Sequence, residues 1–165
     1  MKKHILFVIP FLVLCACGRS ASKAETIPEE FTSAIVITDN GRQFEGVIKL
    51  DKTAWEYEFT APESIKGMNV KYENDTLTTT LEGLSFSDKS DTLPESSPML
   101  LIVNALEMCR SGKGITAVKE GKKVTDKGVV AGADFTVTFE ESTPVSMEIG
   151  GEIAVTFGNE KKPAE

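Results

Sequence analysis

A single apolar helix in a chain of alternating strands is the feature that most constrains this fold. The stretch Ser97–Gly112, SPMLLIVNALEMCRSG, begins with a helix-capping serine and a proline suited to the first helical position, and it ends at a glycine. Its polar residues form one narrow stripe, so that apolar residues cover about two thirds of the circumference. The sequence therefore predicts one helix over residues 97–111 that needs a protein surface, or lipid, packed around it.

The rest of the chain shows the period-two alternation of half-buried strands. Trp55, Tyr57 and Phe59 alternate with polar residues, as in a strand with one covered face and one wet face. Turn sequences such as Asp39-Asn40-Gly41 separate runs of this kind. We expect about five strands before the helix and about five after it, joined mostly by hairpin turns. The fifth of the first group is expected over residues 77–86.

The apolar faces of these strands are too extensive for one flat layer. A helix of about 20 Å cannot cover a flat sheet of about ten strands, whereas a strongly curved sheet can fold around it. The expected fold class is therefore mainly β, with a strongly curved antiparallel sheet (a half-barrel of about ten strands) wrapped around the central helix. Either the cavity is completely filled, or it keeps a groove for an apolar guest. The candidate lining residues are Trp55, Tyr57, Phe59, Met68, Tyr72, Leu101, Ile102 and Leu106.

The N-terminus has the features of an export signal. A basic MKK start precedes the apolar run Ile5–Leu14, which is too short to span a bilayer. The following Leu14-Cys15-Ala16-Cys17 resembles the bacterial lipobox. That resemblance implies diacylglyceryl transfer to the Cys17 sulfur, cleavage before Cys17, and anchoring by acyl chains of the palmitate kind. The alternatives are an ordinary secretory signal cut nearby, or cleavage before Cys15 after the bulky Leu14.

These segments define the expected organisation and location. Residues 1–16 are a lipoprotein signal peptide, 17–30 the lipidated cysteine and a flexible tether, 31–158 one domain, and 159–165 a charged tail. The protein is expected to be extracytoplasmic and anchored to the cell membrane through Cys17, in the outer membrane if the organism has one. No later apolar run approaches the roughly 20 residues of a membrane span.

Composition limits the chemistry. Residues 1–16 hold two of the 18 basic residues, so the remaining chain has 16 basic and 25 acidic residues, a net charge of −9. This charge argues against binding to nucleic acid and against direct adsorption to anionic lipid. His4, the only histidine, leaves with the signal peptide. Cys109 is expected to be a buried structural thiol, since no cation or imidazole accompanies it. The pairs Glu29-Glu30 and Glu140-Glu141 do not converge, because neighbouring strand residues point to opposite faces. We expect no catalytic residue, metal or cofactor, and no enzyme.

A family resemblance supports the curved sheet. The order of lipobox, tether, hairpin, the strand ending WEYEFTAP over Trp55–Pro62, mid-chain helix and late hairpins resembles the LolA/LolB-like superfamily. The runs Phe135–Phe139, Pro144–Ile149 and Ile153–Phe157 are similar to the closing strands of those half-barrels. Two departures are the lack of a helix before the first strand and a lid made of only one helix.

The resemblance implies a concave apolar face that binds lipid or acyl chains, or docks an apolar element of a partner. The leading hypothesis is a non-enzymatic, membrane-anchored envelope lipoprotein that binds a lipid or other hydrophobic ligand. The alternative is a protein-interaction module at the envelope or cell surface, with a filled core and no small-molecule ligand.

Overall fold

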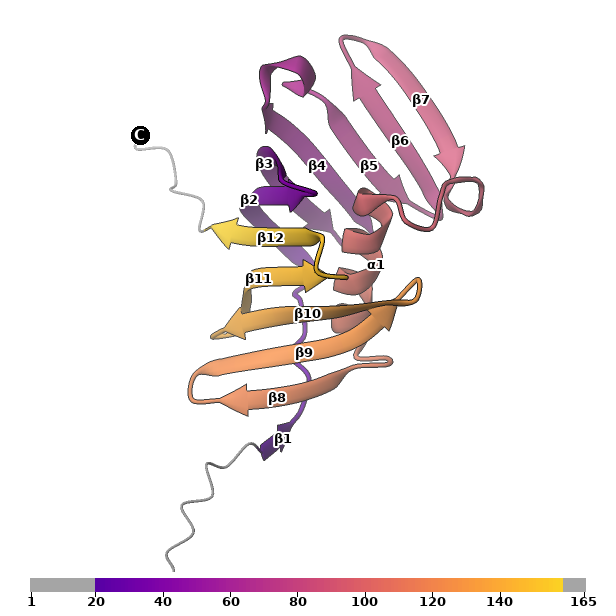
Figure 1. Ribbon diagram of the computed structural model, residues 1–165. Coiled ribbons are helices and arrows are strands. Elements are labelled where there is room, and N and C mark those ends of the chain that lie inside the picture. Colours follow the sequence, from indigo (N-terminus) through magenta and orange to yellow (C-terminus); the bar gives the residue numbers. More distant parts are fainter. Residues whose placement is uncertain (1–19, 159–165) are drawn as a thin grey trace, which may run out of the picture.

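The computed structural model describes residues 20–158, which form one antiparallel sheet of twelve strands around one helix (Figure 1). Cys17 and the predicted charged tail over 159–165 lie outside the described residues. The strands before the helix are β1 (Ser20–Ser22), β2 (Glu30–Asp39), β3 (Arg42–Asp51), β4 (Ala54–Ala61), β5 (Asn69–Glu73), β6 (Thr76–Leu81) and β7 (Leu84–Lys89). Those after it are β8 (Thr116–Glu120), β9 (Lys123–Val130), β10 (Ala133–Glu140), β11 (Thr143–Ile149) and β12 (Ile153–Gly158). The 3₁₀ turns η1 (Glu63–Ile65) and η2 (Ser90–Thr92) lie in loops.

The strand order is β1-β8-β9-β10-β11-β12-β2-β3-β4-β5-β6-β7. Most neighbours are consecutive hairpins, but β12 pairs with β2, so that Phe157 faces Ile35 and Val155 faces Ile37. The helix connects β7, at one edge of the sheet, to β8, beside the other edge. It therefore has to cross the sheet, and it lies in the concavity (Figure 1). The expected fold class is confirmed.

Helix α1 (Pro98–Ser111) has nearly the predicted bounds. Pro98 occupies its first turn, and Gly112 ends it in the left-handed conformation with φ 66°. The Ser97 side chain makes no capping hydrogen bond, although its carbonyl accepts the first helical bond from the Leu101 N–H at 3.0 Å. The buried helix residues are Leu100, Leu101, Ile102, Val103, Ala105, Leu106 and Cys109.

The expected tether is partly wrong, because residues within it already belong to the sheet. Ser20–Ser22 pair with β8 as strand β1, and Ser20 lies opposite Lys119. The following segment, residues 23–29, crosses from β1 to β2 (Figure 1) and places Ile27 in the core at 2% exposure. The backbone N–H of Lys52 also donates to the Glu29 carbonyl at 2.9 Å. An isolated isoleucine in a polar stretch is stabilised by burial, and it fastens the segment to the sheet.

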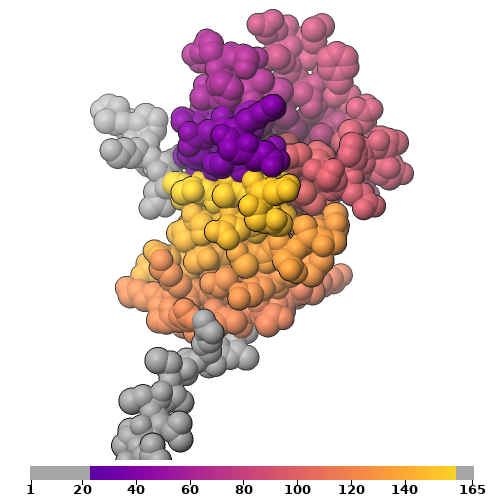
Figure 2. All heavy atoms as spheres, in the orientation of Figure 1, coloured from indigo at the N-terminus to yellow at the C-terminus, as the bar shows by residue number. Residues whose placement is uncertain are grey.

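The single strand expected over residues 77–86 is also wrong. It is the hairpin β6–β7, which reverses at Glu82 and Gly83 with φ values of 50° and 82°. Two consecutive positive φ values are typical of a tight hairpin turn. Strand β7 becomes the free edge of the sheet, and its Leu84 and Phe86 are 66% and 67% exposed. Figure 2 shows this hairpin at the upper rim of the molecule.

Candidate functional site

The C-terminal half of α1 is locked onto the sheet. The Trp55 Nε1–H donates to Glu107 Oε1 at 2.6 Å, and Arg110 holds the same carboxylate through Nε and Nη2 at 2.8–3.1 Å. Trp55, Tyr57, Ile102 and Leu106 are all buried here in one core. The Tyr57 hydroxyl has no hydrogen-bond partner among the described residues, and burial raises its pKa above the ordinary value. The helix fills this part of the concave face.

An apolar groove remains at the N-terminal end of α1. Its volume is about 230 Å³. The walls come from strands β2–β4, the loop after β4 and the first turn of the helix. Its lining residues are Ile37, Asp39, Phe44, Phe59, Ile65, Met68, Pro98 and Met99. All but Asp39 are apolar, so the groove suits a nonpolar guest.

Backbone geometry between β3 and β5 places the groove walls. Gly46 sits at a register shift between β3 and β4, where a side chain would collide with the Glu58 carbonyl oxygen. This close approach brings the Phe44 ring edge-on to Phe59, with centroids 6.4 Å apart. The Phe59 N–H donates to the Met68 carbonyl at 2.9 Å, while the Gly67 N–H donates to the Phe59 carbonyl at 2.8 Å. These two bonds close the loop that carries Ile65 and set Met68 beside Phe59.

The exposed part of β7 lies on the same face of the sheet as the groove. Strand pairing places Val70 opposite Thr79, and Thr79 opposite Phe86. Directly opposite residues in antiparallel strands share a face, so Phe86 lies on the same face as the buried Val70, which is the concave one. Leu84 shares this face because strand residues two apart point the same way. The apolar surface thus continues beyond the helix to the edge of the sheet.

A second, polar cavity of about 690 Å³ adjoins the groove. Asp39 and Pro98 line both cavities. Carboxylates of Asp39, Glu95 and Glu152 stand on the walls of the polar cavity. A guest in the apolar groove therefore has an acidic, water-accessible space next to it.

The predicted lining residues separate into groups. Phe59 and Met68 line the groove, and Leu101 lines the polar cavity. Tyr72 is half-buried and its hydroxyl donates to Asp75 Oδ1 at 3.1 Å. The remaining four, Trp55, Tyr57, Ile102 and Leu106, are packed in the core described above.

Other groove residues were missed from the sequence, chiefly Met99 and Ile65. Ile65 is the only large apolar side chain in the loop over residues 62–67, and this isolation was a usable signal. Met99 belongs to the first turn of a helix that is apolar almost all round, so its sequence position did not distinguish it from core.

A buried carboxyl lies away from the groove, under the segment over residues 23–29. Asp126 on β9 is 0% exposed, and neither carboxylate oxygen has a hydrogen-bond partner among the described residues. Its pKa is raised to about 6, chiefly by burial. The Glu25 backbone N–H lowers this pKa, and the Glu25 carboxylate raises it. Burial, with a smaller contribution from Asp126, raises the pKa of Cys109 to about 12. Cys109 is thus a buried thiol, as expected, and is held protonated.

Residues 20–158 contain neither a metal-binding cluster of side chains nor a helix long enough to span a membrane. Within this range no three His, Cys, Asp or Glu side chains cluster in a way that could hold a metal ion. The one α-helix of the same range is too short to cross a membrane.

Comparison with known proteins gives likenesses of fold only. No protein-family model matches the chain, and no curated protein matches it. Among solved structures, it is similar to the LolA superfamily protein NE2245 from Nitrosomonas europaea, with 12% identity and a TM-score of 0.41 over 77% of this chain and 68% of that one. It is also similar to PNGF-II, with 7% identity and a TM-score of 0.40 over 80% of this chain but only 28% of that one. At these low values neither likeness bears on the family or the function of this chain.

Proposed function

We propose that this chain is an extracytoplasmic lipoprotein, anchored to the membrane through lipidated Cys17, that binds an acyl chain or a similarly slender apolar group without catalysing a reaction. The observation that carries the ligand proposal is the apolar groove between Phe59, Met68 and Met99. It stays open although the core beside it is fully packed. Its continuation onto exposed Leu84 and Phe86 supplies a surface along which a longer chain can lie.

The groove volume sets the size of the guest. A methylene group is about as large as a water molecule, whose share of liquid volume is about 30 Å³, so a groove of about 230 Å³ holds roughly seven or eight methylenes. Cavities for drug-sized ligands start at about 300 Å³. The groove therefore takes one end of an acyl chain, and the rest lies on β6–β7.

The adjoining polar cavity limits the head group. With Asp39, Glu95 and Glu152 on its walls, a carboxylate or phosphate head placed there would be repelled. We therefore expect an uncharged or cationic head group to bind better than a free fatty acid of equal length.

The groove can be tested with the uncharged fluorophore N-phenylnaphthylamine. Trp55 is the only tryptophan and lies on the same strand as Phe59, so a bound fluorophore should quench its emission by energy transfer. Met68→Gln or Met99→Gln should weaken binding, because each places an amide in an apolar wall. Val129→Gln is the matched control: Val129 is 54% exposed and does not line the groove. Equal binding by the Met68 and Val129 variants would refute the groove as the site.

The membrane anchor has its own test. Cys17→Ala should move the protein from the membrane fraction to the soluble one, because two or more acyl chains are needed for stable anchoring. Unchanged fractionation would refute lipidation at Cys17.

One observation favours the second candidate, a protein-interaction module. Among residues 20–158 no strand pairs with the outer side of β7, and an edge strand with exposed Leu84 and Phe86 is a template for adding a partner strand. Crosslinking in cells from a photoreactive residue at Ser87 discriminates between the candidates. One stoichiometric protein adduct, with no fluorophore binding by the purified chain, would favour the interaction module.

A further inference from the structure

We infer that the β1–β8–β9 end of the sheet is a membrane-facing surface, which holds the domain against the lipid bilayer with the apolar groove directed away from it. This inference rests on the proposed anchor at Cys17. It adds the orientation of the domain and names the bilayer surface as the partner of this end of the sheet.

The first support is the length of chain between anchor and fold. Only Gly18 and Arg19 separate Cys17 from strand β1, which begins at Ser20. Three residue steps span at most about 11 Å, whereas a tether over residues 18–30 would span about 45 Å. The β1 edge is therefore confined to the lipid surface.

The second support is the fastening of this edge. Strand β1 is paired with β8 through Ser20, Ala21 and Ser22. The segment that follows is held by buried Ile27 and by the hydrogen bond from Ser142 Oγ to Glu25 Oε2 at 2.8 Å. Unpairing β1 would lengthen the tether only as far as Glu25, where this attachment begins. The anchor thus acts on the folded domain and not on a loose chain.

The third support is a local reversal of charge. Residues 20–158 carry 13 basic and 23 acidic side chains. Residues 113–130, which include β8 and β9, carry five lysines against Glu120 and the buried Asp126. The lysines of this segment are Lys113, Lys119, Lys122, Lys123 and Lys127, and all five are exposed. Basic residues near an anionic lipid surface are attracted to it.

Neighbouring acidic residues do not cancel the attraction of these lysines to anionic lipid. Lys122 pairs with Glu141 at 3.2 Å and Lys123 with Glu140 at 2.9 Å. All four side chains are about half exposed or more, and ion pairs of this kind contribute little, so the lysines can exchange these partners for lipid phosphates. The rest of the described chain carries eight basic and 21 acidic side chains, which an anionic surface repels.

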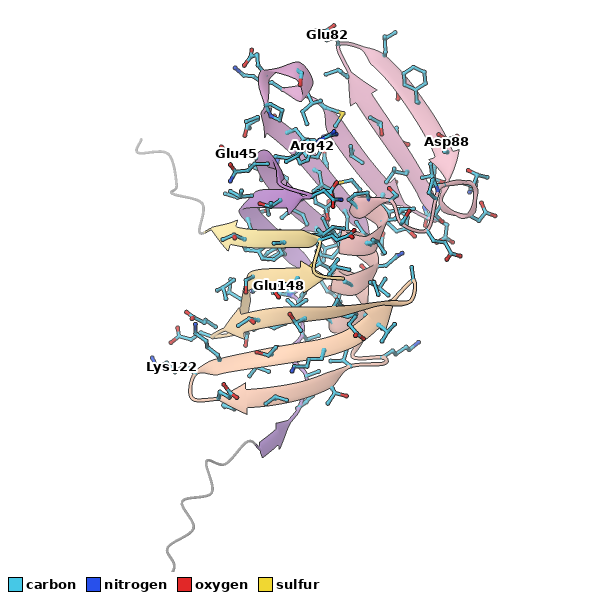
Figure 3. The ribbon with its side chains drawn as sticks, viewed as in Figure 1. Arg42, Glu45, Glu82, Asp88, Lys122 and Glu148 are labelled. Carbon is cyan, nitrogen blue, oxygen red and sulfur yellow. The ribbon has the colours of Figure 1, made fainter. Side chains whose placement is uncertain are left out.

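The groove lies away from this end of the sheet. Its strands β2–β4 are six to eight positions from β1 in the sheet order, about 30–40 Å along the curved sheet at about 4.8 Å per strand, and β7 is eleven positions from β1. Figure 3 labels Lys122, at the β8–β9 turn, and Asp88, on β7, and the two lie at opposite sides of the fold. A guest would therefore be received from the side facing away from the anchoring membrane.

The test places a fluorophore at either end of the lipidated, full-length protein in vesicles. Lys122→Cys and Asp88→Cys each introduce one exposed thiol, while buried Cys109 does not react. The acceptor is a rhodamine-headgroup lipid in vesicles of phosphatidylcholine with phosphatidylglycerol. Energy transfer should be several-fold greater from position 122 than from position 88. The difference should shrink in phosphatidylcholine alone and at high salt.

A linker variant separates the effect of the short tether from that of the lysines. A flexible Gly/Ser insertion between Arg19 and Ser20 should reduce the difference and leave a remainder that high salt abolishes. Equal transfer from the two positions in the unmodified chain, with the protein floating on vesicles, would overturn the orientation and leave the anchor standing. Failure of the lipidated chain to float with vesicles would overturn both.

Discussion

The buried carboxyl of Asp126 predicts a pH dependence of stability that one substitution should remove. Burial raises its pKa from 3.8 to about 6 in the folded protein. The groups around it are the backbone and carboxylate of Glu25 on the crossing segment and the thiol of Cys109 on α1. The matching perturbation is Asp126→Asn, which keeps the shape of the side chain and removes the titration.

The sign follows from the higher pKa in the folded state. Between about pH 4 and pH 6 the folded protein keeps a proton that the unfolded chain has lost, so the free energy of unfolding falls as pH rises through this window. The stabilisation is complete below the unfolded pKa and absent above the folded one. A difference of about two pKa units, at 1.36 kcal/mol each, amounts to about 3 kcal/mol at Asp126.

The assay is urea unfolding followed by the emission of Trp55, the only tryptophan, at several pH values from about 4 to about 8. The quantity to compare is the free energy of unfolding of Asp126→Asn minus that of the unmodified protein, because other carboxyls cancel in this difference. It should rise by about 2 kcal/mol from about pH 4 to about pH 6 and level off at about pH 7. A difference that stays constant over the whole range would refute the reasoning.

Three further predictions concern packing. Glu107→Ala should lower the free energy of unfolding by about 1–3 kcal/mol in urea, because it leaves the buried Trp55 N–H without its acceptor; an unchanged midpoint would contradict this. Gly128→Ala should lower the thermal midpoint, at a cost of about 1–3 kcal/mol, because its Cβ would lie 2.7 Å from the Phe135 ring; a variant as stable as the unmodified chain would show that the ring moves freely. Cys109 should react with a thiol reagent only after unfolding, since it is 0% exposed and its pKa is about 12; rapid alkylation of the native protein would disprove this.

Local signals predicted the parts of the fold that local chemistry decides. The helix follows from Pro98, Gly112 and the apolar run between them, and it is confirmed within one residue. The Asn40-Gly41 turn has positive φ at both residues, as its sequence indicated. The Glu82-Gly83 turn also has positive φ at both residues. It was not predicted, because the apolar alternation continues on both sides of the turn as it would in one strand.

Long-range pairing was beyond local signals. Nothing in the residues of β2 indicates that its neighbour is β12, or that β1 will pair with β8. Such pairings depend on the closure of the whole sheet. The burial of Ile27 depends on the same closure, because the segment crossing from β1 to β2 exists only once those strands have found their places.

The candidate site, like the fold, was predicted in part by local sequence signals and in part depended on long-range packing. Alternation correctly indicated that Trp55, Tyr57 and Phe59 share the inner face, but it did not indicate which of them would touch a cavity. That depends on side-chain volume across the sheet: Trp55 reaches Glu107 on the helix, whereas Phe59 lies at the groove beside the first turn of α1. Packing of this kind is decided in three dimensions by residues far apart in sequence.

Helix α1 fills the concave face at its C-terminal end but leaves a groove at its N-terminal end. A helix of 14 residues is about 21 Å long, while the twelve-stranded sheet extends about 50 Å along its curve, so part of the inner face must find other cover. On the β9 side that cover is the segment over residues 23–29, which places Ile27 in the core and Glu25 beside Asp126. On the β4–β7 side the described chain supplies none, and Leu84 and Phe86 stay exposed. The geometry of one short helix in a wide sheet thus leaves the uncovered apolar surface on the side that the crossing segment does not reach.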